Sequence, residues 1–151
     1  MLNGISKLLT GDVLKILCDM GHGDVLILAD ANFPAESLAR HTALGQVIRL
    51  PGVDVITLFS AIADLFPLDA AYTDHPACVM DLTDGDKQRN MPLPAAWEDF
   101  QTLLTEKYPG CTLGKIQRFD FYDRAGKAYA VIQTGEERQY GNLLLVKGCV
   151  L

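Results

Sequence analysis

The chain has 151 residues, enough for a hydrophobic core, and we expect residues 1–151 to form a single domain. Hydrophobic residues make up 49% of it and charged residues 21%, which is typical of a globular protein. A formal net charge of −6 argues against a general binder of nucleic acid or anionic membranes, because such a protein needs a basic patch. No apolar run approaches the roughly 18 residues of a membrane span, so we expect no membrane partner.

The four cysteines are widely spaced and form no C-x-x-C pair. Their spacing therefore predicts neither a zinc site nor a dithiol redox centre. Cys18 and Cys78 lie in apolar segments, so both are expected to be buried. The first residues show no basic region followed by an apolar one, which predicts no signal peptide and a cytoplasmic protein.

The first third of the chain predicts one helix and two strands. Thr10 or the residues just after it can begin a helix over 13–20, which is apolar enough to be largely buried. The short apolar run 25–29 then predicts a fully buried strand. Residues 31–37, which contain a proline, are expected to form a loop, and residues 46–50 a weak strand.

The middle of the chain continues the alternation of helices and strands. Apolar residues recur at helical spacing over 54–66, which predicts an amphipathic helix that ends at the following proline. Residues 77–82 predict another short buried strand, and the polar stretch 83–90 predicts a loop. A proline at position 94 can open a helix whose apolar stripe runs to residue 108.

The last third predicts a short helix followed by two strands. The helix covers 118–125, a β-prone run covers 129–134, and a buried strand covers 143–147 after a sharp turn at 140–142. Strands that alternate with helices are typical of an α/β fold. We therefore predict a compact α/β domain with a mixed, largely parallel central sheet flanked by helices.

Two residues near the first strand stand out as candidates for chemistry. His22 lies between two glycines that allow a sharp turn before this strand, and Asp30 follows the strand directly. Histidine can titrate near neutral pH, and carboxylates at strand ends often face ligands in α/β folds. The alternatives are ordinary: a polar surface histidine in a turn, and an aspartate that caps the next segment.

Further polar residues fall at predicted ends of strands and helices, and together they would suit a neutral ligand rich in hydroxyl groups, such as a sugar. Taken singly, each also has an ordinary structural interpretation. The three histidines have no spacing typical of a metal site, so no metal is expected. The full set of candidates is His22, Asp30, Asp69, Arg118, Tyr122, Tyr140 and Asn142.

The sequence resembles the RbsD/FucU family of sugar mutarotases, and within it the L-fucose branch. Several motifs carry this resemblance in one order over nearly the whole chain, and residues 84–114 are the least similar part. The matching stretches are Leu2–Ser6, Met20–Asp24, Ala29–Ala35, Leu65–Asp69, Arg118–Ala125, Thr134–Glu136 and Tyr140–Leu143.

The resemblance implies a fold, an assembly and residue roles. It implies a compact α/β subunit in a homo-oligomer, a ring-like decamer with sites at subunit boundaries. His22 matches the catalytic proton donor of the family. The positions that match residues contacting or bordering the sugar are Asp30, Asp69, Arg118, Tyr122, Tyr140 and Asn142. Some fucose mutarotases have histidine where this chain has Asn32, so no second histidine is expected to act here.

The implied reaction exchanges the α and β anomers of L-fucose by opening and reclosing the ring. An acid and a base suffice for this, so no cofactor or metal is expected, and histidine with an ordinary pKa of about 6.5 suits the role. We expect His22 to transfer the proton and Asp30 to orient His22 or to bind a sugar hydroxyl. The alternatives are a D-ribose pyranase that interconverts pyranose and furanose forms, a sugar-binding module without turnover, and a purely structural ring protein.

Overall fold

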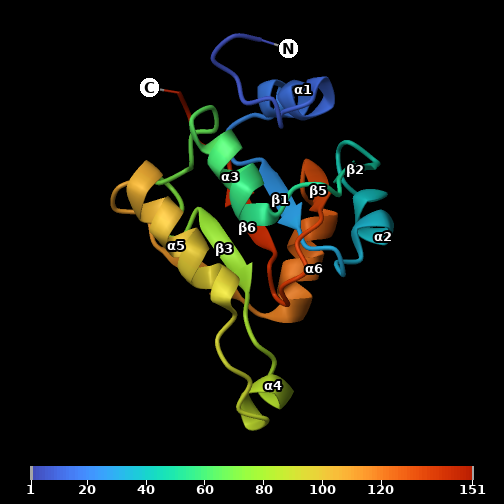
Figure 1. Ribbon diagram of the computed structural model, residues 1–151, viewed down its shortest axis with the longest axis vertical. Helices are drawn as coiled ribbons and strands as arrows, with labels where there is room; N and C mark the ends of the chain where they lie inside the picture. Colours follow the sequence, from blue (N-terminus) through green and yellow to red (C-terminus); the bar gives the residue numbers. More distant parts are fainter. Residues whose placement is uncertain (1, 151) are drawn as a thin grey trace.

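The computed structural model describes residues 2–150, which form six helices and six strands (Figure 1). The helices are α1 (Gly11–Asp19), α2 (Ala35–Ala39), α3 (Val55–Ala63), α4 (Asp84–Gln88), α5 (Ala95–Lys107) and α6 (Arg118–Gly126). The strands are β1 (Val25–Ala29), β2 (Val47–Leu50), β3 (Ala77–Met80), β4 (Leu113–Ile116), β5 (Ala130–Thr134) and β6 (Leu143–Val146).

The strands form one mixed sheet in the order β2-β5-β1-β6-β3-β4. Strand β1 pairs with β5 in parallel and with β6 in the antiparallel sense, and β6 is also antiparallel to β3. The remaining pairs, β2 with β5 and β3 with β4, are parallel. The fold class predicted from the sequence is therefore confirmed.

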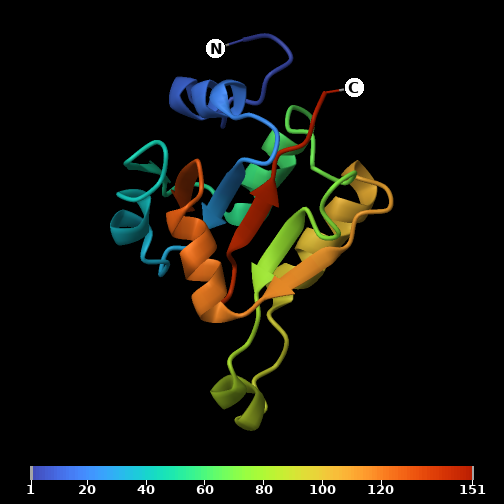
Figure 2. The ribbon, with the colours of Figure 1, turned by 180° about the vertical axis from the view of Figure 1, so that it is seen from behind.

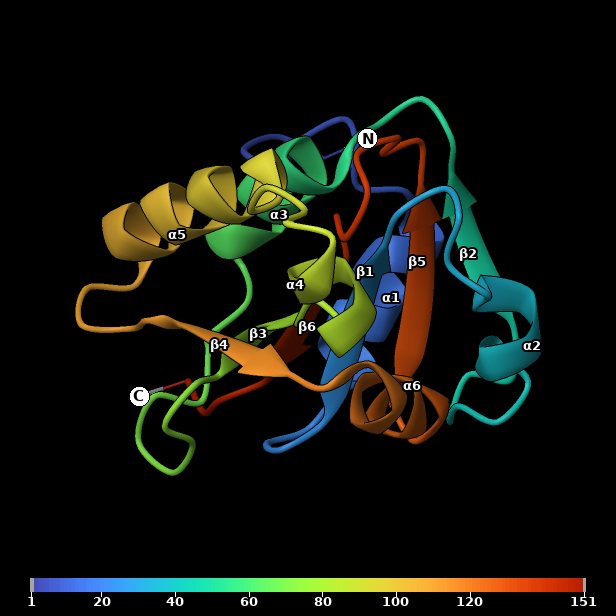
Figure 3. The same ribbon diagram turned by 90° about the horizontal axis from the view of Figure 1, so that it is seen from below.

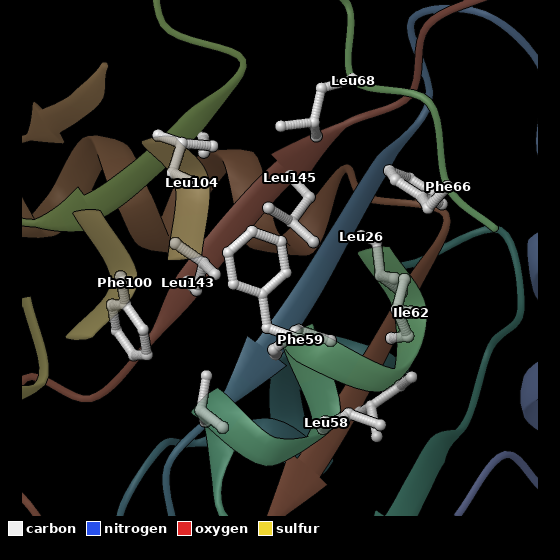
Figure 4. Close-up of a cluster of buried hydrophobic side chains, with 14 of the residues drawn as sticks. Leu26, Leu58, Phe59, Ile62, Phe66, Leu68, Phe100, Leu104, Leu143 and Leu145 are labelled. Atoms are coloured by element: carbon white, nitrogen blue, oxygen red, sulfur yellow. The ribbon is translucent and has the colours of Figure 1, made fainter. Parts of the chain in front are cut away.

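Helices cover both faces of the sheet (Figure 3). The alternation of side chains along β1 shows why. Leu26 and Leu28 belong to the core under α3 and α5, where Phe59 and Phe100 are fully buried (Figure 4). Ile27 and Ala29 point to the other face, which α6 and the short α2 cover. Because both faces are buried, the strand is apolar throughout.

Helix α1 differs from its prediction in burial. The Thr10 hydroxyl accepts a hydrogen bond from the Val13 amide and caps the helix, as expected. Only one face of the helix is buried, because α1 lies at the end of the sheet rather than between layers (Figure 1). Cys18 is consequently exposed, which contradicts the prediction, whereas Cys78 is buried as expected.

Two predicted loops contain helices, and one strand was not predicted. Helix α2 begins at Ala35, inside the stretch 31–37. Helix α4 lies inside 83–90, where Thr83 and Asp86 form a capping box that outweighs the polar composition. Strand β4 was missed because its sequence, LGKI, has no clear alternation, and its pairing with β3 defines it.

The segment around α4 projects from the body of the domain at the end of β1 opposite α1 (Figures 1 and 2). We call residues 81–94 the arm. None of the residues of α4 is buried. Across the described part of the chain, no helix combines the length and apolar character needed to span a membrane.

Candidate active site

The candidate residues separate into two groups at opposite ends of β1. His22 lies in the turn before the strand, and Asp30 lies directly after it. An extended strand rises about 3.3 Å per residue, so the stretch from Asp24 to Asp30 spans roughly 20 Å, and His22 lies before it. One subunit therefore cannot bring His22 and Asp30 to the same small ligand.

The turn that carries His22 is held from both sides. Gly23 adopts a left-handed conformation with φ of 86°, and its amide donates to the Lys147 carbonyl across 2.8 Å. The Gly21 amide donates to the Asp24 carboxylate across 2.7 Å. The Lys147 ammonium also caps the end of α1 through the carbonyls of Leu17 and Met20. The imidazole is thus presented from a fixed backbone.

Asp69 is the side chain that engages His22. Its Oδ1 lies 3.2 Å from His22 Nε2, and its Oδ2 accepts a 2.6 Å hydrogen bond from the Thr73 hydroxyl. The side chain of Asp69 is 6% exposed, whereas that of His22 is 43% exposed and also contacts Tyr72. The Thr73 hydrogen bond, and then His22, lower the pKa of Asp69. The expectation that Asp30 orients His22 is wrong within one chain, because Asp69 occupies that place.

At the other end of β1, Asp30 is buried against Asn142. The Asn142 amide donates to Asp30 Oδ2 and its oxygen accepts from the Asp30 backbone amide, both across 2.8 Å. The Asn32 amide donates to Asp30 Oδ1 across 3.0 Å. Burial raises the pKa of Asp30, and these hydrogen bonds oppose that shift.

Asp30 lies in the wall of a cavity of about 390 Å³, a size typical of small-molecule sites. Arg118 and Tyr122, both on α6, also line the cavity. Arg118 Nε donates a hydrogen bond to the Tyr122 hydroxyl across 3.3 Å. Tyr122 also packs against Phe33, with ring centroids 5.7 Å apart. The cavity is lined by Asp30, Asn32, Phe33, Met80, Arg118, Tyr122, Gln139, Tyr140 and Asn142.

Tyr140 enters this cavity from a strained turn. Its φ of 59° is unusual for a residue with a side chain, and contacts at both ends maintain it. The Trp97 indole N–H donates to the Tyr140 carbonyl across 3.1 Å, and the Tyr140 hydroxyl donates to Asp86 across 2.5 Å. A side chain at Gly141 would meet Glu136 Cγ at 2.6 Å, so only glycine fits there.

The structure thus brings five of the seven predicted site residues to one cavity and places His22 with Asp69 elsewhere. Sequence reasoning missed Tyr72 beside His22, Thr73 beside Asp69, and Gln139 and Asp86 beside Tyr140. Only Asp86 had a local signal, the capping box. A larger hollow of about 770 Å³ between α3 and α5 contains none of the predicted residues. Within residues 2–150 no cluster of three or more metal-binding side chains occurs.

The fold and the cavity describe an α/β protein with a polar cavity of small-molecule size at one end of its sheet and a histidine–carboxylate pair at the opposite end. Residues 3–150 match the model of the RbsD / FucU transport protein family. The chain therefore belongs to the RbsD/FucU family.

Named relatives share nearly the full length of the chain. It is 46% identical to the fucose mutarotase of Mus musculus over 148 residues, which is 97% of this chain and 94% of that protein. It is 40% identical to the L-fucose mutarotase of Histophilus somni over 149 residues, which is 98% of this chain and 96% of the relative. The resemblance identified from the motifs is confirmed.

Solved structures also show the likeness to this family. The fucose mutarotase of Streptococcus pneumoniae in complex with L-fucose has a TM-score of 0.87 and 37% identity, and the match covers 99% of this chain and all of that one. Bacillus subtilis RbsD complexed with D-ribose has a TM-score of 0.68 over the full length of both chains. At 20% identity, that likeness shows the fold alone.

Proposed function

We propose that this protein is a mutarotase that interconverts the α and β anomers of L-fucose. The observation that carries the proposal is the His22–Asp69 pair, a partly exposed imidazole held by an ionised carboxylate, in a chain that also has a sugar-sized polar cavity. The relatives named fucose mutarotase, and the likeness to a structure with L-fucose bound, support this choice of substrate.

The reaction needs only proton transfers. A base removes the proton of the anomeric hydroxyl while an acid protonates the ring oxygen. The bond between the anomeric carbon and the ring oxygen breaks, and an open-chain aldehyde forms. Rotation about the C1–C2 bond and reclosure on the other face give the second anomer. No electron is gained or lost, and positioned acid–base catalysis contributes about 10²–10⁴-fold to such a reaction.

We assign the proton transfer to His22, with Asp69 as the residue that orients it. The imidazole is accessible, and the carboxylate behind it can stabilise the imidazolium that forms. In the cavity, we assign the binding of sugar hydroxyls to Asp30 and Asn142 at the buried end and to Arg118, Tyr122 and Tyr140 around the rim.

A functional site of this kind requires two subunits. His22 and the cavity lie at opposite ends of β1, so the His22 end of one subunit must face the cavity of the next. Such a head-to-tail contact between unlike surfaces closes into a ring when its rotation is suitable. This geometry supports the ring-like homo-oligomer expected from the family. The decamer and the cytoplasmic location stay predictions.

Saturation-difference proton NMR tests the proposed function. One anomeric proton of equilibrated L-fucose is irradiated, and the signal of the other anomer is followed with and without protein. We expect transfer that increases with protein and disappears in His22→Ala. His41→Ala is the matched control, because His41 is exposed and lies outside both groups of site residues. D-ribose in the same assay tests the pyranase alternative. Absence of transfer from the folded wild-type oligomer would contradict the proposal.

A further inference from the structure

Asp86 of the arm contacts the candidate site. Its Oδ2 accepts hydrogen bonds from the Tyr140 hydroxyl across 2.5 Å and from the Thr83 hydroxyl across 2.5 Å. Its Oδ1 accepts from Arg89 across 2.8 Å. The side chain is 13% exposed, and both of its oxygens accept hydrogen bonds from neighbouring side chains. Asp86 belongs to neither group of residues assigned above.

These contacts keep Asp86 ionised. The hydrogen bonds from Thr83, Tyr140 and Arg89 together hold the pKa of Asp86 far below its ordinary value. Burial, the larger cause, and the hydrogen bond to Asp86, the smaller one, raise the pKa of Tyr140, so the phenol keeps its proton. The contact is therefore a neutral phenol that donates to a fixed carboxylate, and the proton stays on Tyr140.

The consequence concerns what Tyr140 can offer to a ligand. A phenol has one proton to donate, and Tyr140 gives it to Asp86. Its oxygen then has only lone pairs left for the cavity. Tyr122 is set in the opposite sense, because its oxygen accepts from Arg118 Nε and its own proton stays free. The two phenols of one cavity are thus arranged as one acceptor and one donor.

We propose that Asp86 is a positioning residue for sugar binding, which fixes Tyr140 as a hydrogen-bond acceptor for a hydroxyl group of the sugar. The inference rests on the proposed function, because it names how that same cavity holds its ligand. It also gives the arm a role, since Asp86 lies in the arm and bonds to Tyr140.

Tryptophan fluorescence offers a direct way to measure how Asp86 affects the binding of L-fucose. Trp97 is the only tryptophan of the chain, and its indole N–H donates to the Tyr140 carbonyl. Its fluorescence therefore reports on the Tyr140 turn and can follow a titration with L-fucose. The variants are Asp86→Asn, Tyr140→Phe and the double variant. Asp84→Asn is the matched control, because it removes the same charge from an exposed position of the same helix.

We expect Asp86→Asn to weaken the binding of L-fucose by about ten-fold, because a neutral amide oxygen holds the Tyr140 hydroxyl less firmly than the charged carboxylate does. Asp84→Asn should bind like the wild type. In the Tyr140→Phe background, Asp86→Asn should cause no further loss, because Asp86 acts through the phenol. Wild-type affinity in Asp86→Asn, or an equal loss in the Tyr140→Phe background, would overturn the inference.

A second readout does not depend on sugar. With ¹³Cζ-labelled tyrosine, NMR should show a lower pKa for Tyr140 in Asp86→Asn than in the wild type, and no change in Asp84→Asn. If Asp86→Asn does not fold, Tyr140→Phe alone decides, because it leaves the capping box intact. Tyr140→Phe should then weaken the binding of L-fucose, because the acceptor oxygen is absent, and wild-type affinity would overturn the inference.

The proposed function and the inference about Asp86 can fail separately. A wild-type protein that neither binds nor exchanges L-fucose would overturn the proposed function together with this inference. A fully active wild type with an unaffected Asp86→Asn variant would overturn the inference alone.

Discussion

His22 Nε2 lies 3.2 Å from Asp69 Oδ1, although 47 positions separate the two residues in the sequence. The antiparallel course of β6 explains the contact. Lys147, just after β6, forms a β-bridge with Leu68 and accepts a hydrogen bond from the Gly23 amide. One residue thus joins the His22 turn to the segment that carries Asp69.

Loss of the Asp69 carboxylate should impair catalysis more than binding. Asp69→Asn keeps the shape but removes the charge that orients the imidazole and stabilises its protonated form. We expect the anomer exchange rate at saturating L-fucose to fall by about 10²-fold, the lower range for acid–base catalysis. Asp74→Asn, an exposed position of the same loop, is the control and should exchange anomers at the wild-type rate. An equally active Asp69→Asn variant would remove Asp69 from the mechanism.

Mixed oligomers should recover activity that neither parent has. His22→Ala destroys one end of the proposed site and Asp30→Asn the other, so a contact between a subunit of each kind leaves one intact site. We expect the co-expressed variants to show exchange well above that of either variant alone, measured by the same NMR assay. If the mixture were as inactive as its parents, with mixed assembly shown by native mass spectrometry, sites shared between subunits would be ruled out.

The stability of the protein should depend on pH through Asp30. Because burial raises its pKa in the folded state, the folded protein binds more protons than the unfolded chain from the ordinary value of 3.8 up to the raised one. The free energy of unfolding contributed by Asp30 therefore decreases as pH rises through this interval. Urea titrations from pH 4 to 8 should show the wild type losing stability relative to Asp30→Asn with rising pH. A constant difference would contradict the raised pKa.

The turn before β6 should tolerate no side chain at Gly141. A Cβ there would lie 2.6 Å from Glu136 Cγ and 2.9 Å from the Arg138 carbonyl oxygen. We expect Gly141→Ala to lower the free energy of unfolding by about 1–3 kcal/mol, the usual range for overpacking, and to weaken sugar binding through Tyr140. Gly52→Ala is the control, since nothing lies within 4 Å of a Cβ at that position. Equal stability of the two variants in urea unfolding would refute the expected clash.

The sequence by itself determined the parts of the fold that depend on local pattern. Apolar runs bounded by turn residues located β1 and β6, and helical spacing located α3 and α5. The motifs identified the family, and they contain all seven candidate residues. Local composition was misleading at α4, where the capping box between Thr83 and Asp86 decides the structure instead.

Only the tertiary structure decided which candidates meet. Along the chain His22 and Asp30 are eight positions apart, but an extended strand carries them to opposite ends of the sheet. Asn142 is 112 positions from Asp30, yet it bonds to it because β6 begins where β1 ends. Distance along a sequence fixes neighbours within a helix or a turn, whereas strand pairing joins residues from any part of the chain. The burial of Asp30, the ionisation of Asp69 and the link between Asp86 and Tyr140 all result from that pairing and from the packing around it.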